Sequence, residues 1–127
     1  MSERDVFEYA LLRVVPRVQR GEFFNAGVVV YCRARGFVGA RTHLDEAKLK
    51  ALDPNADVVG VQAALHAVEG VCRGGTDAGQ AAGDDAGRRF RWLIAPRSTV
   101  IQPSPVHSGL TNDPEAEVTR LLDLLVR

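Results

Sequence analysis

The chain has 127 residues, of which 46% are hydrophobic and 25% charged, and its formal net charge is zero. This length and composition suit one globular domain with a core of its own. Because the net charge is zero, the surface as a whole is not expected to attract nucleic acid. Two cysteines are too few for a disulfide framework.

The first part of the chain predicts three strands. Phe7–Val15 is rich in aromatic and β-branched residues. Asn25–Ala34 carries a continuous Val-Val-Val-Tyr run, which is typical of a central strand with both faces covered. Phe37–Arg41 completes a hairpin through the Arg35-Gly36 turn. In the connection between the first two strands, Gly21 is free to adopt a positive φ.

The periodicity changes after the third strand. Asp45 is placed to cap a short helix over residues 46–53, and Asp57 a second helix over residues 58–72. Asp113 and Pro114 supply the cap and the first-turn proline of a C-terminal helix.

Two segments lie between these helices. Residues 73–87, "RGGTDAGQAAGDDAG", lack large apolar side chains, so we expect a flexible loop. The next stretch, "RRFRWLIA" (Arg88–Ala95), predicts a fourth strand with Phe90, Trp92 and Ile94 on one face. We expect Phe90 and Trp92 to face the core, where they could not stack on bases. The sequence therefore does not favour nucleic-acid binding.

The predicted order is β-β-β-α-α-β-loop-α. Because strands and helices are partly segregated, this order indicates a single α+β domain over residues 1–127. We expect a mainly antiparallel four-stranded sheet with the helices packed on one face.

The sequence also indicates the cellular compartment of the protein. The N-terminal "MSERDVFEYA" is charged and has no apolar signal-peptide core. The longest apolar run, Ala26–Cys32, is far too short to span a bilayer. Cys32 and Cys72 lie in no metal-binding motif and suit buried thiols in a reducing compartment. We therefore expect a cytoplasmic protein without a membrane segment, a metal or a cofactor.

The strongest candidate for a ligand site is the loop Pro96–Gly109. It is long for a small domain, is stiffened by prolines and contains no acidic residue. Its candidate ligand-binding residues are Arg97, Ser98, Thr99, Gln102, Ser104 and His107. The alternative is a loop that only covers an edge of the sheet.

The turn that follows the first strand is the second candidate. Its polar residues are Arg17, Arg20, Glu22 and Asn25. The alternative is a structural turn with an Arg–Glu pair and an Asn that bonds its own loop. If both candidate loops lie at one end of the sheet, Arg17, Arg20 and Arg97 would converge on an anion.

Three stretches together resemble a known family. They are "YALLRVVPRVQRGEFFNAGVVVYC", "LDEAKLKALDPNAD" and "RFRWLIAPRSTVIQPSPVHSGL". They resemble small bacterial proteins catalogued as domain of unknown function 3037, over nearly the whole chain. The resemblance implies no established activity. Similar members in actinobacteria are often encoded beside a HipA-like kinase, which implies an accessory role with such a kinase as partner.

Three functions remain open. The first is a small binding or accessory protein that recognises an anionic small molecule or a protein partner through the two candidate loops. The second is a hydrolase or transferase acting on a phosphate- or carboxylate-bearing substrate, with His107 as acid or base and Arg97 steadying negative charge. The third is a structural homodimer that uses a sheet edge. No residue pattern identifies a catalytic group.

Overall fold

The computed structural model describes residues 3–74, 85–97 and 99–127. These residues form an antiparallel five-stranded sheet and four α-helices, which confirms the α+β class. The strands are β1 (Asp5–Val14), β2 (Phe24–Cys32), β3 (Phe37–Thr42), β4 (Ile101–Pro103) and β5 (His107–Thr111). The helices are α1 (Glu46–Leu52), α2 (Val58–Arg73), α3 (Ala86–Ile94) and α4 (Pro114–Leu125).

The strands are ordered β3-β2-β1-β4, and β5 also pairs with β1. On one side β1 pairs along most of its length with β2, from Glu8 opposite Tyr31 to Val14 opposite Phe24. On its other side β1 pairs first with β5 and then with β4. The sheet therefore ends at β3 on one side and at β4 and β5 on the other.

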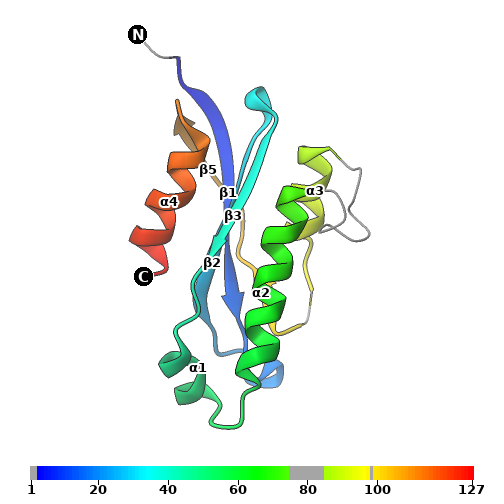
Figure 1. The fold of residues 1–127 in the computed structure, drawn as a ribbon, viewed down its shortest axis with the longest axis vertical. Coiled ribbons are helices and arrows are strands. Elements are labelled where there is room, and N and C mark those ends of the chain that lie inside the picture. The colour runs from blue at the N-terminus through cyan, green and yellow to red at the C-terminus, as the bar shows by residue number, and fades with distance from the viewer. Residues whose placement is uncertain (1–2, 75–84, 98) are drawn as a thin grey trace.

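The helices cover both faces of the sheet, which corrects the prediction of one covered face. Figure 1 shows α4 on one side of the sheet and α2 and α3 on the other. Val28 and Val30 of β2 pack against α4, whereas Val29 packs on the side of α2 and α3. Because successive side chains of a strand point to opposite faces, the buried Val-Val-Val run requires a helix on each side.

The predicted fourth strand is wrong: Ala86–Ile94 is the helix α3. The Asp85 carboxylate accepts the Arg88 backbone N–H at 2.8 Å and so caps its first turn. Phe90 and Leu93, three residues apart, are the buried side chains of this helix, whereas Trp92 is 45% exposed. The buried residues Phe90 and Leu93 thus follow the spacing of a helix, and not the alternation of Phe90 and Trp92 that suggested a strand.

The fourth and fifth strands come instead from the predicted loop Pro96–Gly109 and the residues just after it. Ile101 pairs with Val14 and Thr111 with Asp5, so the two short strands follow one another along β1. The sheet therefore has five strands rather than four. The loop follows the sheet edge, as the alternative reading of it proposed.

The other predicted elements are found close to their expected bounds. The carboxylates of Asp45, Asp57 and Asp113 cap α1, α2 and α4 as the sequence predicted. Gly21 ends a short 3-10 turn with φ at 70°. Of the predicted flexible loop 73–87, residues 75–84 lie outside the described residues. None of the described helices combines the length and apolar character needed to cross a bilayer.

Candidate binding cleft

A cleft of about 630 Å³ opens between α2, the end of α3 and the segment that leads into β4. Most of its walls are apolar, and a few charged or polar side chains lie among them. This combination is the usual character of a small-molecule or side-chain binding site. The cleft is lined by Pro16, Leu49, Asp53, Asn55, Ala56, Asp57, Gly60, Val61, Ala64, Ala67, Val68, Val71, Trp92, Leu93, Arg97, Thr99, Val100 and Ile101.

Helix α2 forms one wall. Val61, Ala64 and Val68 recur at spacings of three and four residues, so they form one stripe along the helix. The small side chains of Ala64 and Ala67 leave the space that a larger residue would fill. The opposite wall is held in place by the Val15 N–H, which donates to the Val100 carbonyl at 2.7 Å.

Arg97 lines the cleft next to the end of α3. Its Nε donates to the Ala95 carbonyl at 3.3 Å, and its guanidinium also donates to the Trp92 carbonyl. The guanidinium carbon lies 5.1 Å from the centre of the Trp92 ring, a cation–π distance. Arg97 therefore stabilises the C-terminal end of α3 and also brings a positive charge to the cleft.

Two carboxylates and Arg17 lie at the other end of the cleft. Asp53 accepts from the Arg17 guanidinium at 3.4 Å and from the Asn55 backbone N–H at 3.1 Å. Asp57 accepts the Gly60 backbone N–H at 3.0 Å as the cap of α2. Both carboxylates thus already have donors within the fold.

The turn between β1 and β2 meets the cleft only at its beginning. Pro16 lines the cleft, and Arg17 reaches it through Asp53. Arg20 instead pairs with Glu22 at 2.8 Å, and neither residue lines the cleft. Their hydrogen bond lowers the pKa of the Glu22 carboxyl and raises the pKa of Arg20. The described contacts therefore do not bring the three predicted arginines together.

Two other predicted residues bond the backbone of neighbouring elements. Asn25 lies on β2 and donates its side-chain amide to the Leu125 carbonyl at 3.2 Å, next to the end of α4. Ser104 is buried between β4 and β5, where its hydroxyl accepts the Leu11 N–H at 2.7 Å and donates to the Pro105 carbonyl at 2.8 Å. The Ser104 hydroxyl thus satisfies backbone groups at the gap between the two strands.

The remaining predicted residues are divided between the cleft and the sheet. Thr99 lines the cleft, and its carbonyl accepts the Gln102 side-chain amide at 2.9 Å. His107 lies on β5, with its ring centre 5.3 Å from that of Tyr9, and it does not line the cleft. Ser98 lies outside the described residues. Arg97 and Thr99 are thus the predicted ligand-binding residues that line the cleft.

Several residues that shape the cleft were not predicted. Trp92 was assigned to the core by the strand prediction, although its exposed ring supports Arg97. Ala64 and Ala67 carry a signal that could have been read, since small residues on an otherwise apolar helix stripe leave a hollow. Asp53 gave no such signal, because its pairing with Arg17 spans 36 positions of the chain.

Two features of the described residues bear on metal binding and on nucleophilic chemistry, and the second, Cys72, lies outside the cleft. Within residues 3–74, 85–97 and 99–127, no three His, Cys, Asp or Glu side chains gather as a metal ion would require. Cys72 is buried, and loss of solvation raises the pKa of its thiol to about 12. A thiol held protonated in this way is a poor nucleophile.

A scan against protein-family models matches residues 9–126 to the family described as "Protein of unknown function (DUF3037)". The chain belongs to this family. No curated protein and no solved structure matches the chain. Membership therefore confirms the resemblance seen in the sequence, and the family's description names no activity.

Proposed function

We propose that this member of the family is a binding protein whose cleft receives an apolar group that carries a carboxylate or a phosphate. The observation that carries the proposal is the apolar cleft with Arg97 in its wall. Pro16, just before the polar residues of the turn, and Val100, in the loop before β4, both line this cleft.

The lining supports an apolar group. Val61, Val68 and Val71 of α2 line the cleft together with Leu93 and Ile101. Each square ångström of apolar surface buried there contributes about 25 cal/mol. Polar side chains are few, so binding energy would come mainly from the body of the ligand.

The charges support an acidic group on that ligand. Asp53 is paired with Arg17, and Asp57 is engaged as a helix cap. Within the part of the chain that the structure describes, Arg97 forms no ion pair and bonds only carbonyl oxygens. A carboxylate or phosphate beside Arg97 would supply the missing negative charge through charge-assisted hydrogen bonds.

The test fills the cleft with a larger side chain and titrates each variant with a probe that has an apolar body and an anionic group. Anilinonaphthalene sulfonate combines an aromatic body with an anionic group and fluoresces in apolar sites. Ala63 and Ala67 are both exposed on α2, but only Ala67 lines the cleft. We expect Ala67→Trp to abolish probe binding and the matched Ala63→Trp to retain it. Equal binding by both variants would refute a function based on this cleft.

A further inference from the structure

The two edges of the sheet differ in their protection. An edge strand exposes unpaired backbone N–H and C=O groups, and proteins usually block such edges with charges, helices or side-chain contacts. The edge strand β3 is blocked in these ways. The edge strand β5 carries no acidic residue, lysine or arginine.

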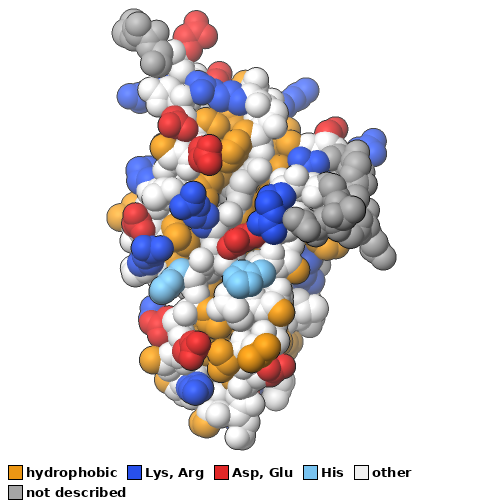
Figure 2. All heavy atoms as spheres, in the orientation of Figure 1, with side chains coloured by type: hydrophobic (Ala, Val, Ile, Leu, Met, Phe, Trp, Pro, Cys, Tyr) orange, Lys and Arg blue, Asp and Glu red, His pale blue; other side chains and the backbone are white. Residues whose placement is uncertain are grey.

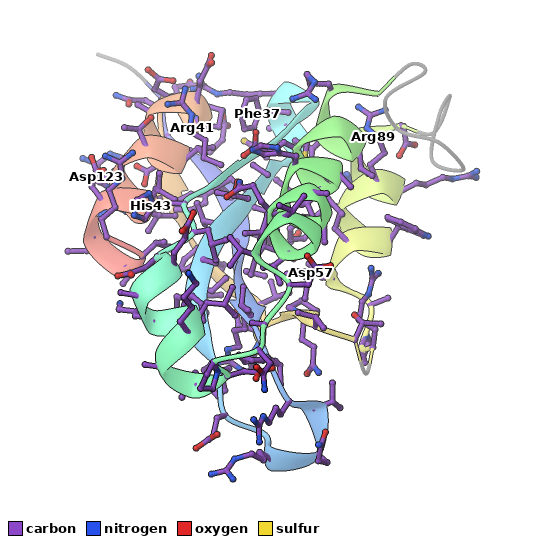
Figure 3. The ribbon with its side chains drawn as sticks, turned by 60° about the horizontal axis from the view of Figure 1, so that its bottom comes forward. Phe37, Arg41, His43, Asp57, Arg89 and Asp123 are labelled. Atoms are coloured by element: carbon purple, nitrogen blue, oxygen red, sulfur yellow. The ribbon has the colours of Figure 1, made fainter. Side chains whose placement is uncertain are left out.

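At the β3 edge, Glu69 of α2 covers the strand. Its carboxylate accepts both the Thr42 backbone N–H, at 3.0 Å, and the Thr42 hydroxyl. Arg41 lies on the same strand between α2 and α4 (Figure 3). Figure 2 shows side chains of both charge signs interspersed over this side of the molecule. A second strand would therefore meet charges and helices at β3.

At the β5 edge, the register shows which backbone groups are unpaired. Leu11 of β1 directs its N–H and C=O toward Ser104, on the side of β4 and β5. In an antiparallel ladder the backbone groups of every second residue point to the same side, so Tyr9, Phe7 and Asp5 also direct theirs toward β5. Their partners there are His107, Gly109 and Thr111, whose backbone groups therefore point toward β1. The N–H and C=O groups of Ser108 and Leu110 consequently point away from the sheet. Among the described residues, no side-chain hydrogen bond reaches the backbone N–H or C=O of Ser108 or Leu110.

This edge combines exposed apolar side chains with the polar side chains of His, Ser and Thr. β5 consists of His, Ser, Gly, Leu and Thr, without an acidic residue, lysine or arginine. Leu110 is 58% exposed, and Val6, its cross-strand neighbour on β1, is 61% exposed. Val106, just before the strand, is also exposed. A strand added here would bury this apolar group and satisfy the backbone groups of Ser108 and Leu110.

We propose that β5 pairs with β5 of a second copy of this chain, antiparallel and about a two-fold axis at Gly109. In this register Ser108 of each copy lies opposite Leu110 of the other, which gives about four new backbone hydrogen bonds. A two-fold contact brings identical strands together, so a strand without acidic residues, lysine or arginine suits pairing with its own copy. Because the formal net charge of the chain is zero, two copies do not repel each other through an overall charge.

Gly109 suits the position on the axis. Residues opposite one another without hydrogen bonds approach most closely in an antiparallel pair, and glycine has no side chain to obstruct that approach. A Cβ added at Gly109 would lie 2.8 Å from the Phe7 ring, so the fold itself also favours glycine there. The proposal is independent of the cleft, because no residue of β5 lines it.

Sedimentation of the full chain over a range of concentrations tests the proposal. The wild-type protein is expected to sediment as a dimer. Leu110→Arg places like charges near the axis and is expected to give a monomer. Ser108→Pro removes an N–H that β1 does not use, and it is also expected to give a monomer. The matched control is Val59→Arg, at a residue 79% exposed on α2, which should remain a dimer.

Thermal unfolding of each variant verifies that it is folded, and amide exchange locates the contact. Exchange at Leu110 should slow as the wild-type concentration rises, whereas exchange at exposed amides of α2 should not. A wild-type chain that is monomeric at about 1 mM would overturn the proposal. A dimer that persists in either Leu110→Arg or Ser108→Pro would also overturn it.

Discussion

The guanidinium of Arg97 lies 5.1 Å from the centre of the Trp92 ring and also donates to the Trp92 backbone carbonyl. One side chain thus completes the end of α3 and brings positive charge to the wall of the cleft. The two roles can be separated by experiment, because the first affects stability and the second affects only the binding of anions.

Replacing Arg97 by Gln should remove a preference for anions. We expect the wild-type protein to bind decanoate more tightly than decanol, which has the same chain length and no charge. Loss of a hydrogen bond to a charged group typically costs about 1.5–3 kcal/mol, so Arg97→Gln should weaken decanoate binding about tenfold or more and leave decanol binding nearly unchanged. Isothermal titration measures both. Arg88→Gln, on the exposed side of α3, serves as the control.

The same substitution should cost little stability. An exposed cation–π contact contributes about 0.5–1 kcal/mol, and the carbonyl contacts at the end of α3 add a similar amount at most. Urea unfolding of Arg97→Gln should therefore show a loss of about 1–2 kcal/mol. A loss of about 4 kcal/mol or more would assign Arg97 to the core structure rather than to recognition.

Phe90 and Trp92 should differ sharply in their importance for stability. Phe90 is fully buried and stacks on Tyr31 with ring centres 5.2 Å apart, whereas Trp92 is 45% exposed. Phe90→Ala should therefore lower the free energy of unfolding by about 3–5 kcal/mol. Trp92→Ala should cost clearly less. Similar losses in the two variants would contradict the helical assignment of this segment, because a strand places both rings on one face.

Ser104 should prove to be structural. Replacing it by Ala removes the acceptor of the buried Leu11 N–H and should cost about 1–3 kcal/mol in stability. Ser108→Ala, at an exposed serine on β5, should cost almost nothing. Chemical unfolding measures both. An unchanged stability in Ser104→Ala, together with a loss of ligand binding, would restore Ser104 as a ligand-binding residue.

Cys72 should resist alkylation. Burial raises the pKa of its thiol to about 12 from 9.0, so at pH 8 the folded protein holds almost no thiolate there. Iodoacetamide should label Cys72 slowly in buffer and quickly in urea, and peptide mass spectrometry distinguishes it from Cys32. Rapid labelling of the folded protein would show that the helices on this face open readily.

The raised pKa also has a consequence for stability. The unfolded chain releases the thiol proton above about pH 9, whereas the folded chain keeps it until about pH 12. The contribution of the neutral thiol is therefore complete below pH 9 and is lost as the pH rises toward 12. A Cys72→Ala variant should show a smaller decline in stability over this interval than the wild-type protein.

The sequence predicted those parts of the fold that depend on local signals. Asp45, Asp57 and Asp113 each precede an apolar periodic run, and each caps the helix that follows. The buried run of β2 was recognised because three consecutive valines need cover on both faces. That same observation should have excluded helices on one face alone.

The errors arose where two periodicities coexist in one short segment. In Arg88–Ala95, Phe90 and Trp92 alternate as in a strand, whereas Phe90 and Leu93 are spaced as in a helix. The three-residue strand β4 was missed because Pro103 ends it and its partner β1 lies about 90 positions earlier. The cleft depends on such long-range pairing, so from the sequence alone only Arg97 and Thr99 among its lining residues were identified as candidates.

We expect the cleft between α2, α3 and the residues before β4 to be the binding site. Two-dimensional NMR of the backbone amides during titration with anilinonaphthalene sulfonate locates the bound probe. If the probe binds in the cleft, the shifts concentrate at Ala64, Val68, Trp92, Arg97 and Val100 and saturate at one equivalent of probe. Shifts concentrated on β5 or on α4 while these five amides remain unchanged would contradict this expectation.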